Sequence, residues 1–279
     1  EVGRIALALE VLPFALPRAR TRHDLSREYI GGMMHHCNLG DQIAMGKSRA
    51  DAERRLLAEF RNMAEHNILH PFGPSFDNPA QDDLAIRQLE IMREAGLPCT
   101  LIFGGSATDM GWYGSESSPE SDPEGLREAV DRFNARIDRQ MALWDAHVGH
   151  RNVFFSGVDE AGPWGVRRQM PFFSELKRRG GRVFVTSGVF KDAGFAVDAN
   201  DDPANIDPAN AAQWHATGGW LLSYAAPFTG PENPDLWRRT KGMRLYQADY
   251  DGLGEYILYE GHHIWNEFVA AGRYKNFNL

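Results

Sequence analysis

The feature that most constrains the fold is a regular alternation of short apolar runs with longer amphipathic stretches. Runs of strand character occupy residues 28–37, 68–74, 99–105, 152–160, 182–190, 218–228 and 254–261. Apolar residues at helical spacing mark the stretches 48–67, 81–97, 122–149 and 163–181 between them. Strands that are joined through helices pair in parallel, so the pattern predicts an α/β fold with a parallel sheet.

The number of these units favours a closed barrel. Seven clear strands, together with a degenerate one expected within 191–213, make eight strand–helix units over about 250 residues, the size of a (β/α)8 TIM-type barrel. A doubly wound open sheet is the alternative. The opening run IALALEVLPFALP ends at prolines and is separated from the rest by RARTRHD. We therefore expect residues 1–22 to be a remnant strand and linker of an upstream domain, and residues 23–279 to be the barrel.

Composition narrows the range of partners. The net charge of −8 argues against nucleic acid, whose binding proteins carry basic patches. No apolar run approaches the roughly 20 residues that a membrane-spanning helix needs. No complete set of metal ligands is visible, so we predict neither a metal nor another cofactor.

Candidate site residues follow from the rule that barrel enzymes place their chemistry at the carboxyl ends of the strands. In this sequence the strand ends and the loops directly after them hold His35, His36, Trp112, Asp159, Glu160, Trp164, Tyr224, Tyr259 and Glu260. Aromatic rings stack on the faces of sugars, and carboxylic acids exchange protons with glycosidic oxygens. These residue types, without a cluster of Lys and Arg, predict a carbohydrate site.

The adjacent acids Asp159 and Glu160 are the sharpest of these signals. Neighbouring residues of a regular strand point to opposite faces, but at a strand end the backbone turns and both side chains can reach one cavity. Two close carboxyl groups push their pKa values apart, so that one can act as an acid while the other stays ionised. The alternative is that Asp159 caps the following helix and Glu160 is a solvated acid of its first turn.

Four segments, of which the last is HHIWNEF near the C-terminus, carry a resemblance to a known family. NVFFSGVDEAGPW, FFSELKRRGGRVFVTS and the long run that begins WHATGGWLLSYAAPF resemble the catalytic domains of glycoside hydrolase family 123 and the related domain of unknown function 4091. The resemblance implies a β-sandwich upstream of the barrel, further elements beyond the C-terminal KNFNL, and a secreted or cell-surface protein.

The resemblance also implies a mechanism. Enzymes of that family cleave β-N-acetylgalactosaminides with help from the substrate's own acetamido group. By position Glu160 would be the general acid and base, and Asp159 would stabilise the acetamido group. Tyr224 or Tyr259 would then bind the acetamido oxygen. The sequence thus predicts a retaining, substrate-assisted hydrolase of 2-acetamido-2-deoxy hexosides with a carbohydrate as its partner. The alternatives are a glycosidase that uses Glu260 as a second carboxylate, and a carbohydrate-binding barrel without turnover.

Overall fold

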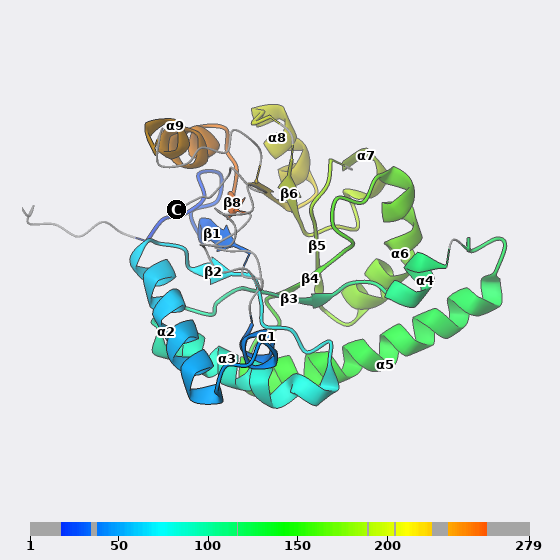
Figure 1. Ribbon diagram of the computed structural model, residues 1–279. Helices are drawn as coiled ribbons and strands as arrows, with labels where there is room; N and C mark the ends of the chain where they lie inside the picture. Colours follow the sequence, from blue (N-terminus) through cyan, green and yellow to red (C-terminus); the bar gives the residue numbers. More distant parts are fainter. Residues whose placement is uncertain are drawn as a thin grey trace, which may run out of the picture.

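The computed structural model describes residues 18–34, 38–115, 117–188, 190–203, 205–224 and 234–255. Within these residues the chain forms eight strands that alternate with helices (Figure 1). The strands are β1 (Ile30–Met33), β2 (His70–Pro71), β3 (Ile102–Ser106), β4 (Val153–Ser156), β5 (Arg182–Val185), β6 (Ala199–Asp202), β7 (Trp220–Ser223) and β8 (Gly252–Glu255).

Every strand pairing is parallel, and the strands follow one another around a ring. One sheet has the order β2-β1-β8 and the other the order β3-β4-β5-β6-β7. Backbone hydrogen bonds join the two sheets at both seams. The Gly73 N–H donates to Phe103 O (2.6 Å) between β2 and β3, and the Asp251 N–H donates to Leu221 O (2.7 Å) between β7 and β8. The predicted (β/α)8 barrel is confirmed.

The helices surround this ring. They are α1 (Leu39–Ala44), α2 (Arg49–Glu65), α3 (Asp82–Glu94), α4 (Met110–Gly114), α5 (Pro123–His147), α6 (Pro163–Arg178), α7 (Phe190–Ala193), α8 (Pro208–Ala216), α9 (Pro234–Arg238) and α10 (Leu245–Gln247), with a 3-10 turn η1 (Pro79–Gln81) and a π-helical segment η2 (Arg239–Arg244). The Ser48 hydroxyl caps α2 by accepting from the Asp51 N–H at 3.1 Å.

Apolar side chains form two buried layers. The larger lies between helices and strands and includes Phe60, Phe133 and Trp144, all about fully buried. The smaller fills the barrel interior, where Phe103, Phe184 and other strand residues meet. Because side chains alternate along a strand, β4 contributes to both layers: Val153 and Phe155 belong to the larger one and Phe154 to the smaller one.

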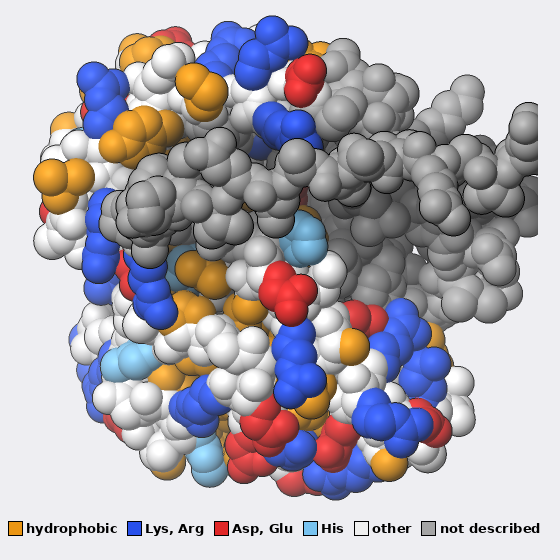
Figure 2. Space-filling model, turned by 90° about the vertical axis from the view of Figure 1, so that its left-hand side faces the viewer, with side chains coloured by type: hydrophobic (Ala, Val, Ile, Leu, Met, Phe, Trp, Pro, Cys, Tyr) orange, Lys and Arg blue, Asp and Glu red, His pale blue; other side chains and the backbone are white. Residues whose placement is uncertain are grey.

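The surface seen in Figure 2 carries acidic and basic side chains interspersed. On α2 and α3 they form ion pairs, such as Arg49 with Glu53 at 2.9 Å and Arg87 with Glu53 at 3.0 Å. None of the helices in the described ranges is long and apolar enough to cross a bilayer.

The structure also corrects several predicted boundaries. The strand expected over 152–160 ends at Ser156, so Asp159 and Glu160 lie in a turn after β4. The degenerate sixth strand is real and is the polar segment Ala199–Asp202. The predicted upstream strand over 1–17 lies outside the described residues, and the division of the chain at residue 22 stays a prediction.

Candidate active site

The turn after β4 is held by its neighbours. The Val158 N–H donates to Oε1 of Gln169, a buried residue of α6, at 2.8 Å. Glu160 then adopts a left-handed backbone conformation with φ of 47°. Such a conformation is unfavourable for a residue with a Cβ and tends to occur at functional sites, where surrounding contacts enforce it.

One hydroxyl group fixes both acids. Thr186 directly follows β5, and its Oγ1 donates to Asp159 Oδ1 at 2.6 Å. The same Oγ1 accepts from the Glu160 N–H at 3.0 Å. Thr186 therefore orients the Asp159 carboxylate and also holds the backbone turn that presents Glu160.

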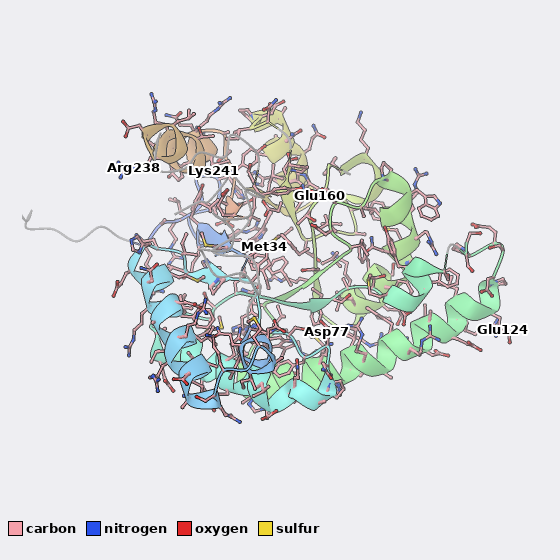
Figure 3. The ribbon with its side chains drawn as sticks, in the orientation of Figure 1. Met34, Asp77, Glu124, Glu160, Arg238 and Lys241 are labelled. Carbon is pink, nitrogen blue, oxygen red and sulfur yellow. The ribbon has the colours of Figure 1, made fainter. Side chains whose placement is uncertain are left out.

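A tyrosine from across the mouth contacts the second acid. Tyr224 directly follows β7, and its phenol donates to Glu160 Oε1 at 2.8 Å. Burial, and then this hydrogen bond, raise the pKa of the Tyr224 phenol above its usual value. The phenol therefore keeps its proton and acts as a hydrogen-bond donor. Figure 3 shows Glu160 near the strands, far from Glu124 at the start of α5.

A second group of ionisable residues is buried at the same end of the barrel. Asp201 and Glu255 lie at the carboxyl ends of β6 and β8, and both are fully buried. Lys241 of η2 places its Nζ 2.7 Å from Glu255 Oε1. Burial first, and then the nearby charge of Glu255, raise the pKa of Asp201 well above its usual range, with Lys241 offsetting part of the effect. The surroundings of Asp201 therefore favour the protonated form of its carboxyl group.

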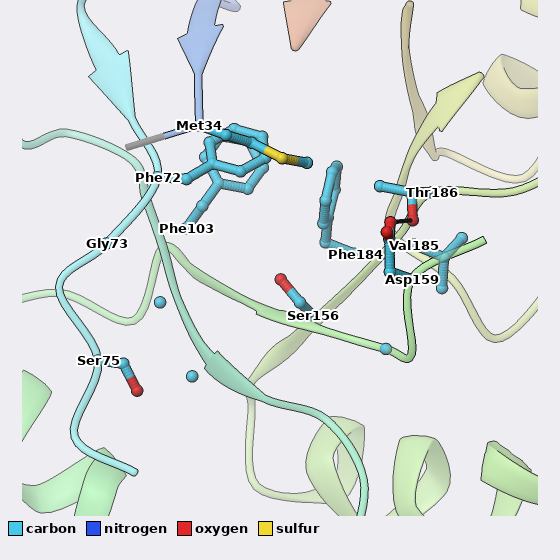
Figure 4. A pocket seen from close by; sticks show the side chains of 13 residues that line it. Met34, Phe72, Gly73, Ser75, Phe103, Ser156, Asp159, Phe184, Val185 and Thr186 are labelled. Atoms are coloured by element: carbon cyan, nitrogen blue, oxygen red, sulfur yellow. Dashed lines mark hydrogen bonds between the residues drawn. The ribbon is translucent and has the colours of Figure 1, made fainter. Parts of the chain in front are cut away.

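A pocket of about 340 Å³ opens beside Asp159 (Figure 4). Its apolar wall is made by Met34, Phe72, Phe103, Phe184 and Val185, and its polar lining by Ser75, Ser156, Asp159 and Thr186. The rings of Phe72 and Phe103 stack with centroids 4.3 Å apart, and Phe184 meets both edge-on. None of the described residues that line the pocket is a lysine or an arginine. The pocket thus suits an uncharged ligand with an apolar ring.

The structure brings together Asp159, Glu160 and Tyr224 among the predicted site residues. Trp112 instead lies in α4, 3% exposed, and its carbonyl oxygen accepts from the Arg168 guanidinium at 2.8 Å. Trp164 is 59% exposed on α6, with the same guanidinium 4.7 Å from its ring centre. Neither tryptophan lines the pocket described above. His35, His36, Tyr259 and Glu260 lie outside the described residues.

Sequence reasoning missed Thr186, Asp201, Lys241 and Glu255. Thr186 lies inside the strand expected over 182–190, but the structure ends β5 at Val185, which places Thr186 at a strand end, where barrel sites form. The acids and prolines of 191–213 hid the strand that carries Asp201. Lys241 gave no signal, because a lysine in a helical stretch is ordinarily solvent-exposed.

Comparison with known proteins returns only structural likeness. No protein-family model matches the sequence, and no curated protein matches it. An organophosphorus hydrolase from Deinococcus radiodurans is 14% identical with a TM-score of 0.40, over 69% of this chain and 61% of that one, which is less than two thirds of its length.

Two further solved structures match a larger part of this chain. An organophosphate hydrolase engineered from a weak promiscuous lactonase is 13% identical with a TM-score of 0.46, over 93% of this chain and 90% of that one. An aldo-keto reductase from Bacillus halodurans in its holo form is 11% identical with a TM-score of 0.39, over 82% of each chain. All three are enzymes, and two are hydrolases; at these identities the likeness is one of fold.

This comparison contradicts the predicted glycoside hydrolase function. The similar structures are organophosphate hydrolases and a reductase, and none of the three is a glycosidase. The physical reason is that the barrel is a scaffold shared by many reactions, and an acid pair at a strand end serves proton transfer in several of them. The family resemblance is not tested by the comparison and stays a prediction.

Proposed function

We propose that the chain is a hydrolase that cleaves a small, uncharged carboxylic ester or lactone with an apolar ring. The observation that carries the proposal is the hydrogen bond of Glu160 to Tyr224 beside a pocket of aromatic side chains. It supports a carboxylate base held in place at the mouth of a barrel, where catalytic groups of this fold gather.

The pocket lining supports the choice of substrate. Phe72, Phe103 and Phe184 offer ring faces and edges to an apolar ring of the ligand. An anionic substrate such as a phosphate monoester would meet Asp159 and no cationic side chain among the described lining residues. An uncharged ester fits this surface, because it needs hydrogen-bonding groups only at the bond that is cleaved.

The arrangement supports a general acid–base reaction. Glu160 takes a proton from a water molecule while that water attacks the ester carbonyl carbon. The carbon–oxygen bond to the leaving group then breaks, and the proton passes from Glu160 to the leaving oxygen. Asp201 lies at the same end of the barrel, and its raised pKa makes it a candidate proton donor beside the base Glu160.

The test is the hydrolysis of 4-nitrophenyl phenylacetate, with 4-nitrophenyl phosphate as the charged comparison. We expect turnover of the ester, and a fall of about 100-fold or more in kcat/KM for Glu160→Gln. Tyr224→Phe should lose about 10-fold, as expected for one hydrogen bond. The matched control is Glu124→Gln, which changes an exposed acid in the first turn of α5, away from the site. Full ester activity in Glu160→Gln, or turnover of the phosphate alone, would contradict the proposal.

A further inference from the structure

A second cluster of chemically active side chains lies at the opposite end of the barrel. His23 precedes β1, His215 lies in the last turn of α8 before β7, and Asp251 directly precedes β8. These are the amino ends of the strands, whereas Asp159 and Glu160 follow the carboxyl end of β4. The cluster is therefore separate from the candidate active site.

The three side chains converge on one point. His215 Nε2 lies 3.0 Å from Asp251 Oδ2, and His23 Nδ1 lies 3.5 Å from Asp251 Oδ1. The two imidazole rings stack, with centroids 3.5 Å apart and planes at 20°. One donor atom from each residue can be chosen so that all three lie within 4.8 Å of one another.

The hydrogen bonds of the Asp251 carboxylate give a second, independent indication of a cation site. It is fully buried, and its Oδ2 already accepts from the Leu221 N–H at 2.8 Å. Its Oδ1 is also buried but makes no hydrogen bond to a described residue, because its contact with His23 Nδ1 is as long as 3.5 Å. A buried carboxylate oxygen without a hydrogen bond is unfavourable, and a cation between Asp251 and the imidazoles would satisfy it.

We propose that His23, His215 and Asp251 bind a divalent transition-metal ion of the zinc type. Two imidazole nitrogens and one carboxylate oxygen form a donor set that suits zinc, with water as a fourth ligand. Zinc–ligand bonds of about 2.0–2.1 Å place tetrahedral ligands roughly 3.4 Å apart. The three donor atoms lie within 4.8 Å of one another, so the side chains close in by at most about 1.4 Å on binding.

The position of the site gives the ion a structural role. Its ligands come from the segments before β1, β7 and β8. Asp251 also bonds through its backbone and side chain to Leu221 of β7, at the seam between the two sheets. A metal ion would cross-link the segment before β1 to this seam, and so would stabilise the closed barrel.

The experiment measures zinc bound by the full chain after treatment with a chelator and dialysis against zinc chloride. The chain has 10 histidines, so the comparison between variants decides the outcome. We expect His23→Gln and His215→Gln each to bind one zinc ion fewer than the wild type. The control is His66→Gln, an exposed residue after α2 outside the cluster, which should bind as the wild type does.

Thermal unfolding gives a second readout. Zinc at about 100 times its dissociation constant should raise the Tm of the wild type by about 5 °C, and the rise should vanish in His215→Gln but persist in His66→Gln. Far-ultraviolet circular dichroism checks that each variant is folded. The inference is overturned if the wild type binds no zinc, or if the two cluster variants bind as much as the control does.

Discussion

Replacing Lys241 with methionine tests the buried ion pair at the mouth of the barrel. The Lys241 side chain is 1% exposed, and its Nζ lies 2.7 Å from the fully buried Glu255. At that distance two unit charges attract by about 6 kcal/mol in a medium with an effective dielectric constant near 20. The Lys241→Met variant keeps much of the side-chain volume and removes the charged ammonium group.

The free energy lost is limited by protonation. Burial already raises the pKa of Glu255 above its ordinary 4.5, and the Lys241 charge opposes that rise. Without Lys241 the carboxyl takes up a proton, and at pH 7 that costs at most about 3.5 kcal/mol, at 1.36 kcal/mol for each of 2.5 pH units. The free energy of protonation is smaller than the attraction that is lost with Lys241, so we expect Glu255 to become neutral in the variant. We expect the free energy of unfolding to fall by about 2–3.5 kcal/mol.

The pH dependence identifies the cause. A group with a raised pKa in the folded state stabilises least where pH exceeds that pKa, so the difference between variant and wild type should grow as pH rises from 4.5 to 7. At pH 5 it should be below about 1 kcal/mol.

Urea unfolding at pH 5, 6 and 7 measures this difference, with Lys241→Met/Glu255→Gln as the control. The double variant has no buried charge at the pair and should recover most of the loss. A loss in Lys241→Met that is the same at all three pH values would refute the reasoning, because it would show that packing and not charge is responsible.

Three other substitutions probe separate contacts. Thr186→Val removes the hydroxyl that fixes the acid pair, and kcat of the ester assay should fall about 10-fold with KM little changed; a change in KM alone would argue against a positioning role. Contact with His70 lowers the pKa of Glu28 to about 2; burial opposes this shift and a hydrogen bond from Thr100 adds to it, so the stabilisation is present above pH 4.5 and lost as pH falls through 2. Because solvent screens this partly exposed group, Glu28→Gln should destabilise by about 1–2 kcal/mol at pH 7 and by much less at pH 2, in urea titrations at both values; an equal loss at both would exclude the charge as the cause. A Cβ on Gly254 would overlap Asp201 Oδ2, so Gly254→Ala should lower the free energy of unfolding by about 1–3 kcal/mol, and an unchanged urea midpoint would show that β8 can shift.

The barrel could be predicted because its strands and helices differ in hydrophobic period. Apolar runs such as NVFF and RVFV become β4 and β5, and the long amphipathic stretch from 122 becomes α5. The exact strand ends could not be predicted, because they depend on tertiary contacts. β4 ends at Ser156, and beyond it the Val158 N–H donates to the side chain of Gln169 in α6 instead of to a neighbouring strand. No local sequence pattern reveals such a contact.

The candidate site could be predicted only in part. The rule that barrel sites form at strand ends led to Asp159, Glu160 and Tyr224, which the structure brings together. The pairing of Lys241 with Glu255 joins residues of a π-helical segment and a strand, and it depends on how η2 packs against the barrel. A sequence pattern records which residues are polar, but not which polar residues are buried together.

The charges at the mouth of the barrel bear on the proposed preference for an uncharged substrate. Asp159, Glu160, Asp201 and Glu255 lie at one end of the barrel, where Lys241 pairs with Glu255 and also lowers the pKa of Asp201. Burial raises the pKa of both Asp201 and Glu255, so the protonated forms of these two carboxyl groups are favoured. The exposed pair Asp159 and Glu160 still leaves a negative potential at the entrance, which repels anions and does not act on a neutral ester. We therefore expect the proposed hydrolase to prefer neutral over anionic esters, because of the exposed carboxylates of Asp159 and Glu160 at the entrance.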